Sequence, residues 1–379
     1  MMTSEPSLPA ATGGRMNILQ VISSSRTSGA EKHMAVLSAG LQGRGHAVTA
    51  AVPPEGWLAD FMRGAGVPTV YLPMRGSHSL ATIFRLRSLI RSNRIDIVHT
   101  HLTRATYLGY FAAALSRVPV ISSVHVLTRD FAYRWLPRGN HWFVAVSNDL
   151  RQRIVARGVP PSRVRTVYNG TDITPDPPTA QQALSVRAEL GVPADALLIG
   201  QFGRVDHFKG QHLLVEAAPS IVRESPRAYF VFVGHAEPAT QQALYEMATE
   251  RGVEDRLRFT GVRNDVARLL HAMDVVTLVS LTEACSMAII EAMTVGRPVV
   301  ATRAGGNLEL VVDGETGVLV ERSPVPIAQA VTSLLVSPDR RSTMGAAARE
   351  RARALFTAPA MAQNMEALYN DVMSVRRPR

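Results

Sequence analysis

The sequence has one cysteine, Cys285, among 379 residues. A single cysteine cannot form a disulfide within the chain and excludes a metal site built from cysteines. This usage fits a reducing compartment. No apolar run approaches the roughly 20 residues that span a bilayer. The opening stretch, MMTSEPSLPAATGGR, lacks the apolar centre of a signal peptide. We therefore expect an unstructured leader and a cytoplasmic protein.

Motifs for several cofactors and metals are also absent. The dinucleotide fingerprint G-x-G-x-x-G and the P-loop pattern do not occur, so neither nicotinamide chemistry nor ordinary ATP hydrolysis is supported. No D-x-D triplet occurs either, which leaves a divalent metal bridging a diphosphate without obvious ligands. We therefore expect no cofactor and no metal site.

The charge is strongly unbalanced. The formal net charge is +10 and the sequence pI is near 10.4, which suggests nucleic acid, a phosphorylated small molecule or a membrane surface as a partner. Nucleic-acid readers usually carry Cys/His fingers or an aromatic RNP motif. Neither is present, and aromatic residues make up only 6% of the chain, so we expect no nucleic-acid partner. An arginine-rich proteome would explain the charge without any partner.

Length and pattern indicate two domains. At 379 residues the chain exceeds what one hydrophobic core usually serves. Short β-branched runs alternate with amphipathic helical stretches, which is the pattern of parallel βαβ units. Strands are predicted at 16–23, 47–52, 69–73, 96–101, 119–125, 142–147 and 164–169, and again at 196–203, 228–234, 257–261, 274–280, 298–302 and 317–320.

Between the halves lies TDITPDPPTA, whose prolines at 175, 177 and 178 predict a linker. We expect an α/β protein of two doubly wound, Rossmann-like domains facing each other across a cleft. The first should span 16–174 and the second 175–357, and a helix in 358–379 should pack back onto the first. In open parallel sheets, ligands bind outside the carboxyl ends of the strands. The segments that follow strands are therefore the candidate site.

Two of these segments have features of an anion site. Gly29 sits where a helix begins after the first strand, and a glycine there lets a phosphate approach free N–H groups. Arg204 and Lys209 share one loop after the first strand of the second half, beside Gly210 and a helix start. Two cations at a helix N-terminus suit a diphosphate. The alternative is a solvated basic loop.

A third segment, TEACSMAIIEAM, carries Glu283 in a turn and Glu291 on the following helix. The helix start offers the N–H groups of Cys285, Ser286 and Met287 to an anion. Carboxylates repel an anion but accept hydrogen bonds from hydroxyl groups. A ligand with a charged middle and hydroxylated ends, such as a sugar nucleotide, satisfies both demands. Taken alone, each glutamate would be interpreted as a surface acid.

Histidines end two strands of the first half, with His99 and His101 in DIVHTH and His125 in SSVH. A histidine at a strand end is more often structural than catalytic. His125 is the best catalytic candidate, because it would face the cleft and is followed by the irregular stretch VLTRDFAYRW.

These residues together resemble family 4 of the retaining glycosyltransferases, which have the two-Rossmann-domain GT-B architecture. The resemblance covers nearly the whole chain, from MNILQVIS to the final helix. Its most specific part is E-x7-E, seen as EACSMAIIE, with AMTVGRPVVAT and GGNLELVVDGETGVLV after it. GRVDHFKG, VAVSNDL and VYNGTD match further family motifs.

The resemblance implies roles for the charged residues of the second domain. Arg204 and Lys209 would hold the donor diphosphate and stabilise the leaving nucleotide. Glu291 would bind the ribose hydroxyls, and Glu283 would contact the transferred sugar. Main-chain N–H groups after Glu283, those of Cys285, Ser286 and Met287, would form part of the phosphate cradle.

Further roles follow from the same resemblance. The N–H group of Gly29 would complete the phosphate cradle, His125 would lie near the anomeric centre, and the backbone of Arg263 would contact the base. The chain departs from the family at two places. The first loop has TSGAE with one glycine where the family commonly has two, and Ala284 follows Glu283 where glycine is frequent. The second departure suggests a different shape of the donor pocket near the sugar.

The family's activity implies a retaining, metal-independent, hexosyltransferase-type enzyme. It would move a sugar from a UDP-sugar or GDP-sugar to a polysaccharide, lipopolysaccharide or lipid-linked acceptor held by the first domain. A donor phosphate oxygen would take the acceptor proton. Alternatives with this architecture are a sugar-nucleotide epimerase and a phosphorylase, although no pyridoxal-phosphate lysine site can be located. A binding subunit without catalysis is a further alternative, against which the intact charged residues argue.

The stretch RGSHSLATIFRLRSLIRSNR predicts how the acceptor is reached. It places Leu80, Ile83, Phe84 and Ile90 among arginines 75, 85, 87, 91 and 94. Basic amphipathic helices of this kind lie on anionic membranes, which predicts a peripheral location on the inner face of the cytoplasmic membrane. The alternative is an ordinary helix that packs its apolar side on its own sheet.

Overall fold

The computed structural model describes residues 14–26, 28–74, 79–126, 140–174, 176 and 180–376. Most of the predicted leader, Arg75, most of VLTRDFAYRW and the prolines of the predicted linker lie outside these residues. The chain forms two compact units. The first comprises 1–146, 151–167 and 358–379, and the second comprises 147–150 and 168–357.

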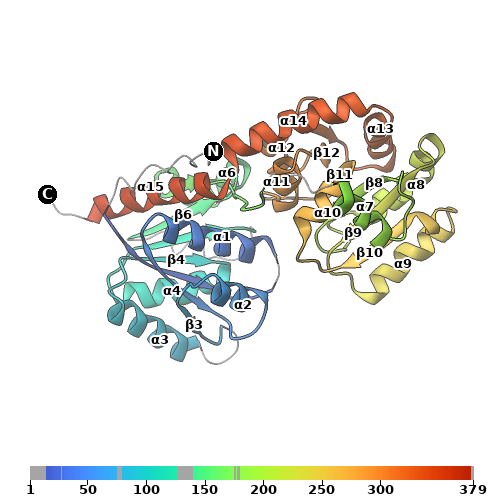
Figure 1. Ribbon diagram of the computed structural model, residues 1–379. Coiled ribbons are helices and arrows are strands. Elements are labelled where there is room, and N and C mark those ends of the chain that lie inside the picture. The colour runs from blue at the N-terminus through green and yellow to red at the C-terminus, as the bar shows by residue number, and fades with distance from the viewer. Residues whose placement is uncertain are drawn as a thin grey trace, which may run out of the picture. The chain divides into compact units, whose positions relative to one another are not determined.

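The first unit is built on a seven-stranded parallel sheet with the order β3-β2-β1-β4-β5-β6-β7 (Figure 1). Its strands are β1 (Asn17–Ile22), β2 (Ala47–Val52), β3 (Thr69–Tyr71), β4 (Ile97–His101), β5 (Val120–Val124), β6 (His141–Ala145) and β7 (Val164–Thr166). Its helices are α1 (Gly29–Gly43), α2 (Trp57–Gly64), α3 (Ser79–Ser92), α4 (Thr103–Ala114), α6 (Asn148–Ala156), which starts in the second unit, the 3₁₀ turn η2 (Pro161–Arg163) and α15 (Ala358–Arg376).

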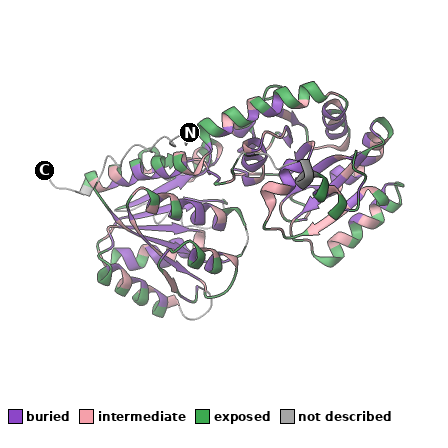
Figure 2. Ribbon diagram, viewed as in Figure 1, coloured by how far each residue is buried: buried purple, intermediate pink, exposed green. Residues whose placement is uncertain are grey.

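Buried apolar side chains cover both faces of this sheet. On one face, α1, α2 and α15 pack over residues such as Ile18 and Ile97. On the other face, α3 and α4 pack over Leu19 and Val98. The alternation follows from the strand geometry, because successive side chains point to opposite faces. The central strands β1, β4, β5 and β6 are therefore buried along almost their whole length, as Figure 2 shows.

Helix α15 completes the first unit from the far end of the sequence. Tyr369 and Leu368 join the cluster formed by Leu37 and Leu41 of α1. At Gly40 an added Cβ would lie 2.9 Å from the Cβ of Ala362, so the glycine lets the two helices approach closely. The C-terminal helix thus packs within the first unit, alongside α1 (Figure 1).

The second unit has a six-stranded parallel sheet with the order β10-β9-β8-β11-β12-β13. Its strands are β8 (Leu197–Phe202), β9 (Ala228–Val233), β10 (Leu257–Gly261), β11 (Val275–Leu278), β12 (Val299–Thr302) and β13 (Gly317–Val320). Its helices are α7 (Ala180–Glu189), α8 (Gln211–Glu224), α9 (Pro238–Thr249), the 3₁₀ turn η3 (Glu254–Arg256), α10 (Val266–Ala272), α11 (Met287–Thr294), α12 (Asn307–Leu310), α13 (Pro324–Leu335) and α14 (Pro338–Leu355).

Every segment predicted as a strand contains one, and the predicted α/β class of two doubly wound sheets is confirmed. Each sheet reverses its strand order once, between β1 and β4 in the first unit and between β8 and β11 in the second. At such a switch point the loops leaving two neighbouring strands run in opposite directions and leave room for a ligand. Among the described residues, no helix is long and apolar enough to cross a membrane.

The first unit ends at Val167, before position 174, where the sequence analysis places the domain boundary. Side-chain hydrogen bonds account for the difference. The Glu309 carboxylate accepts from the Tyr168 hydroxyl at 2.8 Å and from the backbone N–H of Asp149 at 2.7 Å. The Asn169 amide donates to the Cys285 carbonyl at 2.9 Å. These bonds attach the start of α6 and the residues after β7 to the second unit.

A buried ion pair between α15 and the loop after α1 gives a stability prediction. The Glu366 carboxylate accepts from Arg44 Nε at 2.6 Å and contacts His46 Nε2 at 3.1 Å. The side chains of Arg44, His46 and Glu366 are 7%, 0% and 3% exposed. Removing one partner of a buried pair typically costs about 3–5 kcal/mol. Glu366→Gln should therefore lower the unfolding free energy of the first unit by that order.

The control is Asp371→Asn on the same helix, whose ion pair with Arg165 has side chains 54% and 59% exposed. Exposed pairs contribute little, so this variant should unfold like the wild type. Urea denaturation followed by tryptophan fluorescence reports the first unit selectively, because the residues of the second unit include no tryptophan. Equal effects of the two substitutions would contradict the importance of the buried pair.

Candidate active site

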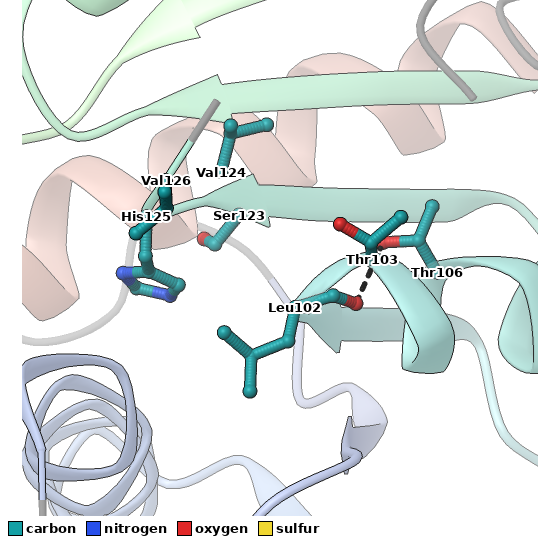
Figure 3. A pocket seen from close by; sticks show the side chains of 7 residues that line it. All are labelled: Leu102, Thr103, Thr106, Ser123, Val124, His125 and Val126. Carbon is teal, nitrogen blue, oxygen red and sulfur yellow. Dashed lines mark hydrogen bonds between the residues drawn. The ribbon is translucent and has the colours of Figure 1, made fainter. Parts of the chain in front are cut away.

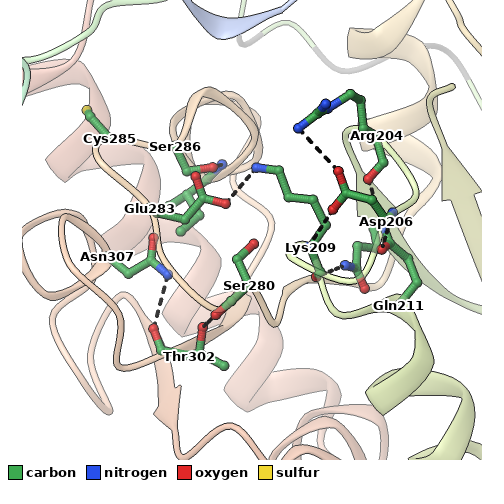
Figure 4. Close-up of polar contacts among 12 residues, drawn as sticks. Arg204, Asp206, Lys209, Gln211, Ser280, Glu283, Cys285, Ser286, Thr302 and Asn307 are labelled. Atoms are coloured by element: carbon green, nitrogen blue, oxygen red, sulfur yellow. Dashed lines mark hydrogen bonds and ion pairs between the residues drawn. The ribbon is translucent and has the colours of Figure 1, made fainter. Parts of the chain in front are cut away.

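The strongest cluster of charged residues lies at the switch point of the second sheet. Strands β8 and β11 are paired neighbours, with Gly200 opposite Val276. The loops that leave them bring Lys209 Nζ within 2.6 Å of Glu283 Oε1 (Figure 4). The lysine side chain is 26% exposed and the glutamate side chain 10%. Two site residues that the sequence predicts at the ends of separate strands thus form one partly exposed ion pair.

The loop after β8 is held by its own polar side chains. The Asp206 carboxylate accepts from the backbone N–H of Lys209 at 2.9 Å and pairs with Arg204 at 3.2 Å. The Gln211 amide donates to the Arg204 carbonyl at 2.9 Å (Figure 4). The backbone of the loop is therefore fixed, while the Arg204 side chain remains 67% exposed. Sequence analysis identifies both cations but assigns no role to Asp206 or Gln211.

Glycines set the distance between the site loops. Gly210 has a φ of +77°, and a Cβ there would lie 2.3 Å from the Val279 carbonyl oxygen at the end of β11. In the loop after β12, a Cβ on Gly306 would lie 1.9 Å from the Ala284 carbonyl oxygen, and the Gly306 N–H donates to the Glu283 carbonyl at 2.9 Å. No side chain fits at either glycine, so the turn that carries Glu283 rests directly on neighbouring backbone.

Helix α11 begins where the sequence predicts, next to Glu283. Ser286 is its N-cap, and its hydroxyl accepts from the N–H of Ile289 at 3.4 Å. Burial raises the pKa of the Cys285 thiol to about 12, so this cysteine stays protonated and is not a nucleophile at neutral pH. The helix itself starts at Met287 after the Ser286 N-cap, so Cys285, predicted to lie at the helix start, precedes it by two residues.

The two glutamates of the E-x7-E motif have different environments. Glu283 lies in the loop and pairs with Lys209. Glu291 lies within α11 and is only 4% exposed. The burial of Glu291 indicates that its carboxylate is part of a polar interior and not of a charged surface, because unpaired surface acids of this size stay solvated. Its contact with ribose hydroxyls stays a prediction.

The side chain of Arg263 is committed to an ion-pair network. It donates to both carboxylate oxygens of Asp265 at 2.8 Å and also contacts Glu189. Arg268 pairs with the same two carboxylates at 2.9 Å. Hydrogen bonds from Arg263 lower the pKa of Asp265 to about 2. This network ties the loop after β10 to α7, so any contact of Arg263 with a base would come from its backbone, as the resemblance implies.

In the first unit, Gly29 starts α1 as predicted. The preceding Ser28 donates its hydroxyl to the carboxylate of Glu31 in the first helical turn and makes no side-chain capping bond. Backbone N–H groups at this helix start are therefore not covered by Ser28. No contact of the described residues tests whether Gly29 binds phosphate.

His125 follows β5 and lines a cavity of about 220 Å³ (Figure 3). The other residues of the cavity wall come from the end of β5 and the start of α4: Leu102, Thr103, Thr106, Ser123, Val124 and Val126. Burial lowers the pKa of His125 well below its usual value, so the imidazole is neutral at physiological pH. A neutral imidazole can donate one hydrogen bond and accept another.

The other two histidines that end strands also lie beside His125. His101 Nδ1 is 3.2 Å from His125 Nε2, and His99 stacks on His101 with ring centroids 4.5 Å apart. His33 of α1, which sequence analysis does not single out, completes the group with its ring 4.7 Å from that of His125. The sequence does not distinguish a buried histidine in an amphipathic helix from a solvent-exposed one. Only the packing of α1 against the sheet shows that His33 faces the other histidines.

Comparison with known proteins agrees with this geometry. The family model described as Glycosyltransferase Family 4 matches residues 27–174, and the model described as Glycosyl transferases group 1 matches residues 184–351. The chain is 30% identical over 295 residues to a D-inositol 3-phosphate glycosyltransferase from Thermomonospora curvata, covering 69% of this chain and 68% of that protein.

Two further similarities concern a second enzyme and a solved structure. The chain is 27% identical to the UDP-Gal:alpha-D-GlcNAc-diphosphoundecaprenol alpha-1,3-galactosyltransferase of Escherichia coli, covering 72% of this chain and 74% of that enzyme. The crystal structure of HepE from Anabaena in complex with UDP and glucose superposes with a TM-score of 0.85 at 23% identity, covering 94% of this chain and 100% of that one. The chain therefore belongs to glycosyltransferase family 4, and its two sheets are those of a GT-B glycosyltransferase.

Proposed function

We propose that this glycosyltransferase moves a sugar from a nucleoside diphosphate sugar to a polysaccharide, lipopolysaccharide or lipid-linked acceptor, with retention of the anomeric configuration and without a divalent metal. The observation that carries the proposal is the Lys209–Glu283 ion pair at the switch point of the second sheet. Two known proteins support the ligand classes: HepE was crystallised with UDP and glucose, and the Escherichia coli relative is named for UDP-Gal and a diphosphoundecaprenol acceptor.

The ion pair can serve a donor with a charged middle and a hydroxylated end. The Lys209 ammonium has three N–H donors, one of which contacts Glu283 at 2.6 Å. The remaining donors can bind a phosphate oxygen while Glu283 accepts from hydroxyls of the sugar. Arg204 is 67% exposed and can turn its guanidinium to a second phosphate oxygen, which it binds through two parallel N–H groups.

Helix α11 adds charge stabilisation without a side chain. The N–H groups of Ser286 and Met287 lie at the helix N-terminus, which carries a partial positive charge, and that of Cys285 directly precedes it. Together with Lys209 and Arg204 they would stabilise the negative charge that develops on the leaving diphosphate. Glu291 would hold the ribose hydroxyls, and Gly29 and Arg263 would offer backbone groups to the phosphate and the base.

His125 fits a place near the anomeric centre as a neutral hydrogen-bonding group. Its buried imidazole has a lowered pKa, so it orients a hydroxyl without adding positive charge. In the proposed reaction a donor phosphate oxygen takes the proton of the acceptor hydroxyl as the bond to the leaving group breaks. Closure of the site around the donor would exclude water and limit hydrolysis.

Helix α3 offers a surface for a membrane-bound acceptor. Ile90 packs into the core with Leu86, so this part of the predicted apolar face binds its own sheet and not a membrane. Leu80 and Phe84 instead remain 71% and 59% exposed. Exposed Arg85 and Arg91 lie on the same helix. We name Leu80, Phe84, Arg85 and Arg91 the α3 surface, and we infer that it binds anionic lipid at the cytoplasmic face of the membrane.

The first experiment tests the ion pair. Glu283→Ala and Lys209→Ala should each lower turnover by about 10²–10³, because each removes a charge-assisted contact to the transition state. Hydrolysis and transfer are measured with UDP-glucose, UDP-galactose and GDP-mannose as donors, and thermal melting should show folded variants. Arg227→Ala is the control, since its pair with Asp195 in the same unit has side chains 60% and 67% exposed. Near wild-type turnover in both site variants would contradict the assignment.

The second experiment tests independence from metal. Turnover should persist in excess chelator, because Lys209, Arg204 and the start of α11 supply the positive charge that a divalent ion would otherwise provide. The control adds magnesium in excess over the chelator. A loss of activity in chelator that magnesium or manganese restores would show that the donor diphosphate needs a metal.

The third experiment tests the α3 surface by co-sedimentation with anionic and neutral vesicles at low and high salt. We expect binding to anionic vesicles at low salt only. Each arginine near such a surface contributes about 1 kcal/mol, so Arg85→Ala with Arg91→Ala should weaken binding roughly 30-fold. The matched control, Arg340→Ala with Arg353→Ala on α14, removes the same charge from exposed positions of the second unit. Indifference of the wild type to anionic vesicles would favour a soluble acceptor.

A further inference from the structure

Three buried histidines converge in the first unit from separate elements. His33 lies on α1, His101 ends β4 and His125 follows β5. Their exposed fractions are 0%, 0% and 9%. One ring nitrogen of each lies within 4.8 Å of the corresponding nitrogens of the other two. Three imidazoles gathered around one point, away from solvent, are the protein ligands of many catalytic and regulatory zinc sites.

The spacing of one nitrogen pair fits two ligands of a common ion. His101 Nδ1 and His125 Nε2 are 3.2 Å apart. Two nitrogens bound to zinc at about 2.0–2.1 Å in a tetrahedron lie about 3.3–3.4 Å from each other. The ring of His33 is tilted 71° to that of His125 and 58° to that of His101, whereas the rings of His101 and His125 are nearly parallel at 23°.

A second layer of side chains orients His101. Gln20 Oε1 lies 2.7 Å from His101 Nε2. Because a carbonyl oxygen only accepts, Nε2 carries the proton and Nδ1 directs its lone pair at His125. Metal-bound histidines typically donate their other nitrogen to such an oxygen. His99 stacks on the outer face of His101 and has its own nitrogens engaged by Tyr369 Oη at 2.6 Å and Ser123 Oγ at 2.8 Å.

The chemistry of the group selects the kind of ion. Imidazole suits zinc, copper and nickel, whereas magnesium, calcium and manganese prefer oxygen ligands. The cavity that His125 lines (Figure 3) leaves room for a fourth ligand on that side. We propose that His33, His101 and His125 bind one zinc-class divalent transition-metal ion.

This site differs from the donor site in place and in effect. It lies in the first unit, whereas Lys209 and Glu283 lie in the second. One consequence rests on the proposed function. If His125 binds an ion, its imidazole can no longer form a hydrogen bond with the sugar. Zinc should therefore slow transfer, and the metal-free enzyme should be the active form. The site would then regulate the enzyme and would not supply a catalytic metal.

The test is metal binding by the intact chain, and it does not depend on activity. Protein stripped with chelator and dialysed is titrated with Zn²⁺ by calorimetry and with Co²⁺ by visible absorption. We expect one ion per chain and the intense Co²⁺ bands of a tetrahedral site. His33→Ala and His101→Ala should abolish binding, and Gln20→Leu should weaken it by about 10–100-fold. His207→Ala is the control, because His207 stacks on His212 at 4.6 Å in the second unit.

Melting of each metal-free variant is measured first, and His33→Gln or His101→Gln replaces the alanine variant at the same position if that variant does not fold. The proposal is overturned if the wild type binds neither ion, if the His33 and His101 variants bind as the wild type does, or if His207→Ala removes the binding. Failure of the donor assignment would leave these results unchanged, since none of them involves a nucleotide or a sugar.

Discussion

The ion pair between Lys209 and Glu283 joins the two loops that leave the second sheet where its strand order reverses. The site depends on it because each partner lies in a different loop and each loop is anchored independently. Asp206 and Gln211 hold the lysine loop, and Gly306 lets the turn before α11 rest on backbone. A cation and a carboxylate are thus held 2.6 Å apart before any ligand arrives, which is what preorganised electrostatic catalysis requires.

The two sheets share a topology but differ in the chemistry of their strand ends. In the second unit the switch point carries charged side chains and the N-terminus of α11. In the first unit the corresponding ends of β4 and β5 carry His101 and His125, which are buried and neutral. A charged end suits a diphosphate, and a neutral polar end suits hydroxyl groups. The same topology therefore presents two chemically different sets of strand ends.

The strands could be predicted because parallel strands covered on both faces are continuous apolar runs bounded by turns. The positions of Arg204, Lys209 and Glu283 after strands could be predicted because polar residues after such runs fall at one edge of the sheet. The Lys209–Glu283 distance could not, since it depends on the register of β8 against β11 and on glycine contacts at 210 and 306. The roles of His33 and Glu366 could not be predicted for a similar reason, because their partners come from distant parts of the chain. The partner of Glu366, for example, is His46.

We infer that the Lys209–Glu283 site binds a nucleotide through its diphosphate. Calorimetry with UDP and GDP, set against UMP, GMP and the free nucleosides, measures this directly. One diphosphate should bind clearly more tightly than its monophosphate and its nucleoside, with an affinity that falls as salt rises because charges are paired. Equal affinity for the diphosphate and the nucleoside, or the same preference retained in Lys209→Ala, would contradict the account.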